Sequence, residues 1–146
     1  MLVHATCVAL RPRGRAWRAV LLRGPSGVGK SDLALRLIET GARLVSDDQT
    51  ELTRTGKAVI ATPPAKIAGL IEARGVGIVR LARDRLLARA SVALLVDLVP
   101  SERIERLPEP ARARLLGIDL PVLALAPFEA SALAKLRLAL ARIAAA

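Results

Sequence analysis

The chain has few of the residues that disulfides, base-stacking surfaces and membrane spans require. Its 146 residues include one Cys, no Tyr, and Trp17 and Phe128 as the only aromatic residues. The single Cys7 allows no intrachain disulfide, and two aromatic side chains cannot form the stacking platform of a single-strand nucleic-acid-binding protein. No apolar run approaches the roughly 20 residues of a membrane span, and the N-terminus lacks a signal-peptide pattern. We therefore expect a cytoplasmic protein that binds no membrane.

Positive charge, by contrast, is abundant. The chain carries 23 Lys and Arg against 13 Asp and Glu, which gives a formal net charge of +10. This balance is compatible with nucleic-acid binding, but the basic residues are spread along the chain, so we rank that function lowest and expect no nucleic-acid partner. The charge is better suited to attracting an anionic nucleotide or an acidic protein. The length and the 53% hydrophobic content suit a single domain over residues 1–146 with an aliphatic core.

One motif predicts a phosphate-binding site. The stretch Gly24-Pro25-Ser26-Gly27-Val28-Gly29-Lys30-Ser31 has the Gly-x-x-x-x-Gly-Lys-Ser spacing of the Walker A loop. Its glycines allow successive backbone N–H groups to turn inward around a phosphate chain. Lys30 adds positive charge at the terminal phosphates, Ser31 is placed to ligate Mg²⁺, and the helix that follows points its positive end at the same anion. The motif therefore predicts that the chain binds a nucleotide.

The flanks of this motif contain the strand and the helix that such a loop requires. Residues 17–22 end in an apolar, partly β-branched run that predicts a strand, and residues 31–40 have the apolar periodicity of a helix. Gly41 stands where a helix ends, and residues 43–46 predict the next strand.

The rest of the chain is richer in strands than in helices. Further strands are predicted at residues 2–9, 51–54, 57–61, 77–81, 91–97 and 120–125, a short strand or helix at 67–71, and an amphipathic helix at 129–143. The fold class is therefore α/β and strand-rich, with a helix after the phosphate loop and an amphipathic C-terminal helix. It differs from doubly wound kinases, in which strands and helices alternate throughout.

Three aspartates compete for the role of the acid beside the phosphates. Asp47 and Asp48 follow the strand at 43–46, at the edge of an open α/β sheet where ligands bind. Adjacent strand residues point to opposite faces, so both acids reach the phosphates only if the strand has ended, and a solvated turn is the equal alternative. Asp97 follows the apolar run 92–96, as in a Walker B strand, and would help to hold the Mg²⁺ of an ordinary P-loop small-molecule kinase.

Two further positions are unusual for their residue types. His4 is the only histidine, and it fits a sheet-edge residue as well as a catalytic one. Glu72 and Arg74 stand two apart before Gly75 and Gly77, so on a strand their side chains would share a face. There they could serve a metal and a phosphate together, or they could form an ion pair before a turn.

Three motifs in order resemble those of the catalytic, C-terminal domain of the HPr kinase/phosphorylase family. Residues 24–35 are similar to the family's Gly-x-Ser-Gly-x-Gly-Lys-Ser-Glu-x-Ala-Leu, residues 41–48 to its Gly-His-Arg-Leu-Val-Ala-Asp-Asp, and residues 72–78 to its Glu-Ile-Arg-Gly-Leu-Gly-Ile. Three motifs at matching separations are more specific than a Walker A loop alone. The resemblance implies a P-loop domain of the HPr kinase and phosphoenolpyruvate carboxykinase-like type.

The resemblance also implies an activity. Family members use ATP and Mg²⁺ to phosphorylate a serine of the phosphocarrier protein HPr, and they catalyse the reverse phosphorolysis. By this resemblance Lys30 would hold the phosphates, and Ser31 and Glu72 would ligate Mg²⁺. Asp48 would take the serine proton, and Asp47 would support the metal or its waters.

Three more residues are implied to be catalytic by the same resemblance. His4 aligns with the family's active-site histidine. Arg74 lies in the signature motif at 72–78. Arg106, within residues 104–107, resembles the arginine of the family's Phe-Asp-Arg-Leu and would stabilise charge on the transferred group.

The chain also departs from the family pattern. It resembles the catalytic domain alone, so we expect a short form without the family's N-terminal domain. Residues 124–129 carry no positive side chain where the family has a basic loop associated with phosphorolysis, so the kinase direction is the firmer expectation. The chain also ends a helix earlier than the family, which weakens the expectation of a hexamer while a homo-oligomer is still expected.

The sequence leaves two other functions open. The first is a non-catalytic nucleotide sensor that regulates a partner protein bound to its basic surface. The second is the P-loop small-molecule kinase that would use Asp97 as its Walker B acid.

Overall fold

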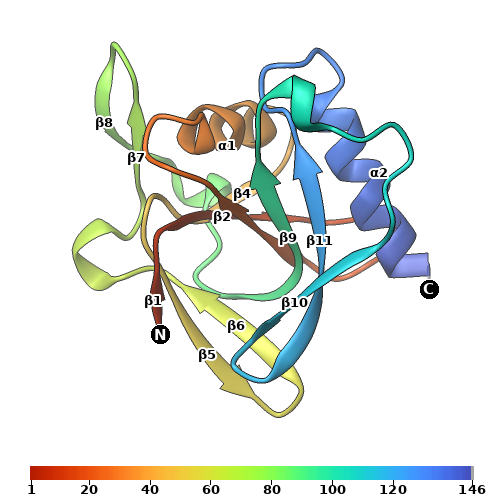
Figure 1. Cartoon of the computed structure of the whole chain (residues 1–146). Helices are drawn as coiled ribbons and strands as arrows, with labels where there is room; N and C mark the ends of the chain where they lie inside the picture. Colours follow the sequence, from red (N-terminus) through yellow and green to blue (C-terminus); the bar gives the residue numbers. More distant parts are fainter. Residues whose placement is uncertain (146) are drawn as a thin grey trace.

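The computed structural model describes residues 1–145, which form eleven strands, two α-helices and three short 3₁₀ helices (Figure 1). The strands are β1 (Leu2–Val3), β2 (Ala5–Leu10), β3 (Arg18–Arg23), β4 (Arg43–Ser46), β5 (Thr50–Thr55), β6 (Ala58–Thr62), β7 (Leu70–Ala73), β8 (Gly77–Arg80), β9 (Ala90–Leu98), β10 (Ala111–Leu115) and β11 (Ile118–Leu125). The helices are α1 (Lys30–Glu39) and α2 (Ala132–Ala145), with 3₁₀ turns η1 (Ala65–Ile67), η2 (Arg83–Arg85) and η3 (Ser101–Arg103).

Most of the strands join one mixed sheet around β9. This strand pairs in parallel with β3 and β11, and its first residues pair antiparallel with β6. The sheet continues from β3 through β2 to β4, from β6 through β5 to β1, and from β11 to β10. Because β3 and β9 are parallel neighbours, their carboxyl ends lie side by side, with Arg23 opposite Asp97. The loop that follows β3 therefore leaves from the edge of the sheet where α/β proteins bind ligands.

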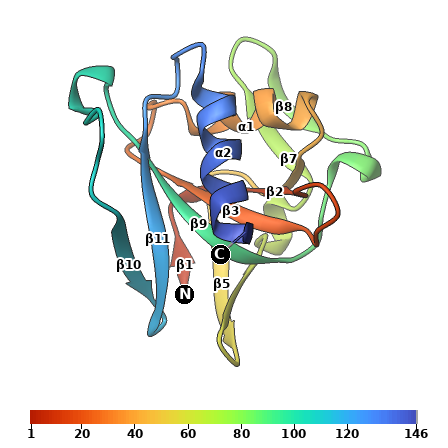
Figure 2. The same cartoon turned by 90° about the vertical axis from the view of Figure 1, so that its right-hand side faces the viewer.

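The two α-helices cover one face of this sheet (Figures 1 and 2). Alternate residues of β3, Val20 and Leu22, point to this face and pack with Leu33 and Leu37 of α1. The α2 helix adds a stripe of apolar side chains that includes the fully buried Leu136. Burying a large apolar side chain of this kind stabilises the folded state by about 1.5–3 kcal/mol. The packing on this face therefore holds α1 and the loop before it in place.

A second apolar cluster lies on the opposite face. It contains the other alternating residues of β3, Ala19 and Leu21, together with Leu52 and Val59 from the β5–β6 hairpin and Leu95 of β9. Side chains from the β10–β11 hairpin also pack against it. Strand β9 is buried on both faces. Its sequence is therefore a continuous apolar run, as in central strands, and does not alternate between apolar and polar residues.

The expected α/β, strand-rich order is confirmed, with α1 after the phosphate loop and the amphipathic α2 near the C-terminus. Three local features differ from the expected elements or were left open by them. The first strand is interrupted at His4, so that β1 pairs with β5 while β2 pairs with β3 and β4. Residues 111–115 form a strand that was not expected, and residues 67–71 divide between η1 and β7. Ala146, the last residue of the expected 1–146 domain, lies outside the described residues.

Within residues 1–145, no helix combines the length and the apolar character needed to cross a membrane.

Candidate functional site

The segment between β3 and α1 folds as a glycine-dependent loop. Gly24, Gly27 and Gly29 have φ values of 153°, 83° and 109°, a region that side-chain-bearing residues rarely adopt. A Cβ at Gly29 would lie 2.8 Å from the ring of Phe128, so a side chain at this position would also collide with its neighbour. The amide of Val28 closes a turn inside the loop by donating to the Pro25 carbonyl. The conformation agrees with the phosphate cradle predicted from residues 24–31.

Lys30, the first residue of α1, bridges this loop. Its side chain is 7% exposed, and its Nζ donates to the carbonyl oxygen of Gly24 at 2.5 Å. The N-cap of the helix is Gly29, which has no side chain to satisfy the first backbone N–H groups. The buried ammonium and the free helix N-terminus therefore converge on one place where an anion would be stabilised.

Asp47 connects three elements of the site. Its carboxylate is 6% exposed, and its Oδ1 accepts hydrogen bonds from the hydroxyls of Ser31 at 2.6 Å and Thr6 at 3.0 Å. Its Oδ2 accepts the backbone N–H of Glu72 at 2.9 Å. The carboxylate thus fixes the end of the phosphate loop, strand β2 and the β7–β8 hairpin relative to one another.

Asp48 lies beside this hub but turns outward. Strand β4 ends at Ser46, and Asp48 has a φ of 66°, a left-handed conformation that aspartate tolerates better than most residues. Its backbone N–H donates to the Thr6 hydroxyl at 3.0 Å, while the residue as a whole is exposed. Strand β4 has therefore ended before the acid pair, so the alternation of a regular strand does not force the two carboxylates to opposite faces.

Glu72 and Arg74 belong to the projecting β7–β8 hairpin (Figure 1). Glu72 is exposed and is held beside the phosphate loop through its own amide, which donates to Asp47. The condition for the two side chains to share a strand face is not met, because β7 ends at Ala73 and Arg74 lies in the exposed turn. Among the described residues the two form no ion pair with each other, so both charged groups stay available to a ligand.

The two remaining candidates, His4 and Arg106, lie in different parts of the molecule. His4 is exposed at the break between β1 and β2, two residues before the Thr6 that bonds to both aspartates. Arg106 is exposed on the segment that links η3 to β10. Figures 1 and 2 both show this segment on the opposite side of the molecule from the β7–β8 hairpin that carries Glu72. Arg106 is therefore not brought to the Asp47 cluster.

Asp97 forms an ion pair with Arg23. Its two oxygens accept hydrogen bonds from Arg23, from Nε at 2.7 Å and from Nη2 at 3.1 Å. The Ser31 hydroxyl, which a Walker B acid would support, bonds to Asp47 instead. Asp47, and not Asp97, therefore contacts the Ser31 hydroxyl.

The donors around Ser31 suit a magnesium ion. Mg²⁺ takes oxygen ligands and is usually bound by one or two carboxylates together with substrate phosphates. The Ser31 hydroxyl is bonded to the Asp47 carboxylate, and the backbone N–H of Glu72 is bonded to the same carboxylate, so residues that carry such oxygens come from adjoining elements. No group of three or more His, Cys, Asp or Glu able to hold a metal occurs in the described part of the chain.

Sequence reasoning missed two parts of the site. Thr6 is fully buried and bonds to both aspartates, and its one signal was a polar residue within the apolar run of β2. An apolar hollow of about 280 Å³ also lies against the loop, between Val28, Val99 and Phe128. The sequence pattern could not predict this hollow, because its walls come from three distant segments.

Comparisons with known proteins agree with this geometry. Residues 2–137 match the family model described as HPr Serine kinase C-terminal domain. The HPr kinase/phosphorylase of Geobacillus thermodenitrificans is 36% identical over 111 residues, covering 70% of this chain and 36% of that protein. That of Chlorobaculum tepidum is 41% identical over 120 residues, covering 75% and 35%. The chain thus spans little more than a third of the length of these two relatives.

A solved structure supports the same assignment. The HPr(Ser) kinase/phosphatase from Coxiella burnetii matches with a TM-score of 0.80 and 26% identity, over 97% of this chain and 88% of that one. The motifs, the fold and the family match agree over nearly the whole chain. This chain therefore belongs to the HPr serine kinase C-terminal domain family.

Proposed function

We propose that this chain is a protein-serine kinase that uses ATP and Mg²⁺ to phosphorylate an HPr-like phosphocarrier protein in the cytoplasm. The observation that carries the proposal is the Asp47 carboxylate, which ties the Ser31 hydroxyl to the backbone of Glu72, with the exposed Asp48 beside it. The relatives named HPr kinase/phosphorylase support the class of protein substrate.

The phosphate loop binds the ATP phosphates in this proposal. Backbone N–H groups of residues 24–31 surround the phosphate chain, and the free N-terminus of α1 faces it. The Lys30 ammonium is already held at the loop by the Gly24 carbonyl, so it needs little reorganisation to bind a phosphate oxygen. Phosphoryl transfer depends mainly on this positioning and on positive charge around the transferred group.

Ser31 and Glu72 would hold the Mg²⁺, with Asp47 orienting the Ser31 hydroxyl or a ligated water. When bound, the ion supplies positive charge that neutralises the phosphate oxygens. Asp47 already accepts three hydrogen bonds and is nearly inaccessible to solvent, so it serves as an anchor and not as the base.

Asp48 is the general base in this proposal. Its carboxylate is exposed, so the serine of a protein substrate can approach it, and its backbone is fixed by the bond to Thr6. Asp48 accepts the proton of the serine hydroxyl while the serine oxygen bonds to the γ-phosphorus and the bond to ADP breaks. Such a base contributes about 10²–10⁴-fold to the rate.

Three further residues are assigned supporting roles. His4, at the break before β2, and Arg74, in the β7–β8 turn, are both exposed, so each would be open to contact with a protein substrate. Arg106 can stabilise the transferred group only if residues 104–110 of this or a neighbouring copy approach the loop. A homo-oligomer would provide that neighbouring copy. We propose the kinase direction as the principal activity, because residues 124–129 have no positive side chain.

The test is a phosphorylation assay with HPr from the same organism. The purified chain, ATP and Mg²⁺ should add one phosphate to an HPr serine, read by intact mass and by mapping of the modified peptide. Asp48→Asn serves as the matched control and should give no product. Absence of serine phosphate at saturating ATP and Mg²⁺ would refute the proposal, and ATP binding without turnover on HPr would favour a nucleotide sensor.

A further inference from the structure

The apolar hollow against the phosphate loop has no role in the mechanism proposed above. It has a volume of about 280 Å³ and is lined by Gly27 and Val28 of the loop, Val99 and Pro100 after β9, and Phe128 after β11. Sites for whole small molecules usually measure about 300–1,000 Å³, so this hollow suits one part of a larger ligand. Because the loop itself forms a wall, the rest of that ligand would lie on the loop.

The order of the strands sets the direction in which a ligand would cross the loop. Strands β3 and β4 are both antiparallel to β2, so they run the same way, and β9 and β11 run parallel to β3. All four therefore end at one edge of the sheet. Across that edge β4 and β11 each lie two strand positions from β3, about 10 Å to either side of it. The acids that follow β4 and the hollow formed after β9 and β11 thus flank the phosphate loop on opposite sides.

A nucleoside triphosphate fits this arrangement in one direction. Ser31 and Asp47 are bonded to each other on the β4 side of the loop, and the exposed Asp48 lies next to them. The proposed phosphoryl transfer places the γ-phosphate at this acid pair. The α-phosphate and its nucleoside would then extend away from β4, toward the ends of β9 and β11. The hollow lies at that end of the path.

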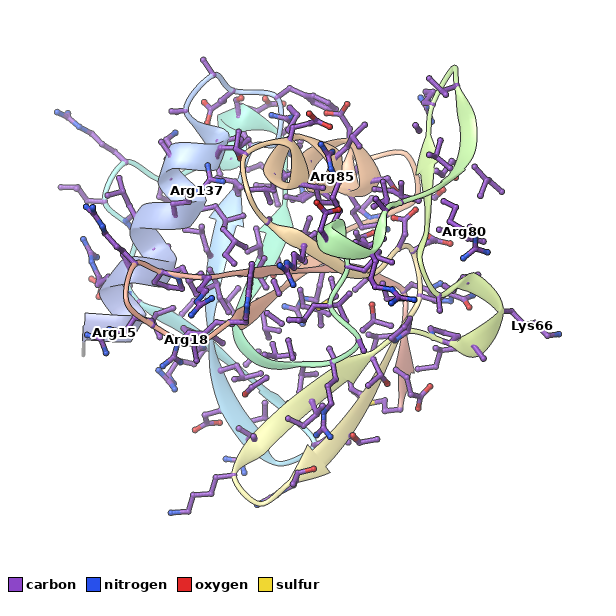
Figure 3. All side chains as sticks on the ribbon, turned by 180° about the vertical axis from the view of Figure 1, so that it is seen from behind. Arg15, Arg18, Lys66, Arg80, Arg85 and Arg137 are labelled. Atoms are coloured by element: carbon purple, nitrogen blue, oxygen red, sulfur yellow. The ribbon has the colours of Figure 1, made fainter. Side chains whose placement is uncertain are left out.

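The walls of the hollow suit an uncharged group. None of the described residues that line it is acidic or basic. Figure 3 shows labelled cationic side chains in other regions, with Arg15, Arg18 and Arg137 along α2 and near the β2–β3 turn, and Lys66 and Arg80 on η1 and β8. The hollow therefore offers no charge that would hold a phosphate, whereas its apolar surface can cover a flat ring.

Phe128 supplies an aromatic ring at this hollow. Its side chain is 71% exposed, although the tip of the ring reaches the backbone of the phosphate loop. A Cβ at Gly29 would lie 2.8 Å from its Cζ atom. The ring is thus placed beside the loop with most of its surface open to a ligand.

The segment that carries Phe128 is anchored on both sides of this residue. The carbonyl oxygen of Pro127 accepts a hydrogen bond from Nη2 of Arg36 on α1. The carboxylate of Glu129 forms an ion pair with Nζ of Lys135 on α2 at 3.0 Å. The backbone that presents the ring is therefore tied to both helices, and less ordering is needed when a ligand binds.

We propose that the nucleobase of the phosphate donor lies in this hollow and stacks on the ring of Phe128. The inference rests on the proposed binding of ATP at the phosphate loop, and it adds the residue that holds the base. Every base has a π face, so stacking on an aromatic ring requires no base-specific hydrogen bonds. Phe128 would therefore raise the affinity for ATP relative to a triphosphate that has no nucleoside.

Calorimetric titration with ATP and with inorganic tripolyphosphate, each in the presence of Mg²⁺, tests the inference. Tripolyphosphate measures binding to the phosphate loop alone, while ATP measures binding to the loop and the hollow. Phe128→Ala should weaken ATP binding about tenfold, within the range of base stacking on an aromatic side chain. The same variant should bind tripolyphosphate as the unaltered chain does, which also shows that its loop is folded.

The matched control is Leu138→Ala, because Leu138 on α2 is an apolar side chain of nearly equal exposure, 70%. This variant should bind both ligands with unchanged affinity. The inference is overturned if Phe128→Ala keeps its ATP affinity, or if Leu138→Ala weakens ATP binding as much. Equal weakening of ATP and tripolyphosphate by Phe128→Ala would also overturn it, because the residue would then act on the loop and not on the base.

Two further outcomes separate this inference from the proposed function. If Phe128→Ala raises the KM for HPr while ATP affinity is unchanged, the hollow receives the protein substrate, and the inference is wrong while the kinase proposal stands. If the unaltered chain binds neither ATP nor tripolyphosphate, the proposed nucleotide site is refuted, and the inference is refuted with it.

Discussion

The Ser31 hydroxyl donates to the Asp47 carboxylate at 2.6 Å, and this bond joins the start of α1 to the end of β4. In a Walker A loop the same hydroxyl is the magnesium ligand. Its orientation in this chain is therefore set by a buried acid that follows β4, although Asp97 ends the strand adjacent to β3. We therefore expect Asp47 to affect both the stability of the fold and the activity.

Replacing Asp47 with Asn should lower both stability and activity. The carboxylate accepts three hydrogen bonds, and an amide offers one acceptor oxygen and an NH₂ group that faces donors. We expect the free energy of unfolding to fall by about 1–3 kcal/mol, the usual cost of leaving a buried polar group unsatisfied. Urea denaturation measures this loss. Asp32→Asn, at an exposed i,i+4 ion pair, should cost less than about 1 kcal/mol.

Thr6→Val should weaken the site without changing the shape of the side chain. The Thr6 hydroxyl donates to Asp47 and accepts the amide of Asp48, so its loss leaves both groups without that partner. We expect kcat to fall together with the free energy of unfolding, while nucleotide affinity is largely retained. Thr6→Ser keeps the hydroxyl and should restore kcat. Equal kcat losses in the two variants would contradict the assigned role of the hydroxyl.

The buried Cys7 should make stability fall at alkaline pH. Burial raises the pKa of its thiol far above the ordinary value of 9.0. Above pH 9 the unfolded chain loses this proton while the folded chain keeps it, so the free energy of unfolding decreases by up to about 1.4 kcal/mol per pH unit. Below pH 9 the thiol is protonated in both states and has no such effect. Urea denaturation of the wild type and Cys7→Ala from pH 7.5 to 10.5 should show a steeper alkaline decline in the wild type.

Much of this fold could be predicted because its signals are local. The phosphate loop, α1 and the central strand β9 follow from glycine spacing, helical periodicity and an apolar run. β10 could not be predicted in the same way, since its Ala-Arg-Ala-Arg-Leu sequence lies at the exposed side of a hairpin and buries little. The end of β7 at Ala73, which moves Arg74 out of the strand, depends on the turn at Gly75 and Gly77.

The site was harder to predict because it is assembled from distant segments. Asp47 was recognised by its place after a strand, but its partners Thr6 and Glu72 come from opposite directions along the chain. By its place after a strand alone, Asp97 has a pattern as good as that of Asp47. The resemblance at residues 41–48 already favoured Asp47 and Asp48, and the packed structure adds that Asp97 pairs with Arg23 while Asp47 bonds to Ser31.

Asp48→Asn should abolish phosphoryl transfer while ATP binding persists. Asparagine tolerates the left-handed backbone found at this position, so the change removes charge and basicity with little strain. If Asp48 is the general base, kcat should fall about 10²–10⁴-fold with the ATP dissociation constant nearly unchanged. The matched control is Asp97→Asn, which breaks the partly exposed ion pair with Arg23 and should lower kcat far less. The opposite ranking, with Asp97→Asn inactive and Asp48→Asn active, would assign the chemistry to Asp97 and favour a small-molecule kinase over a protein-serine kinase.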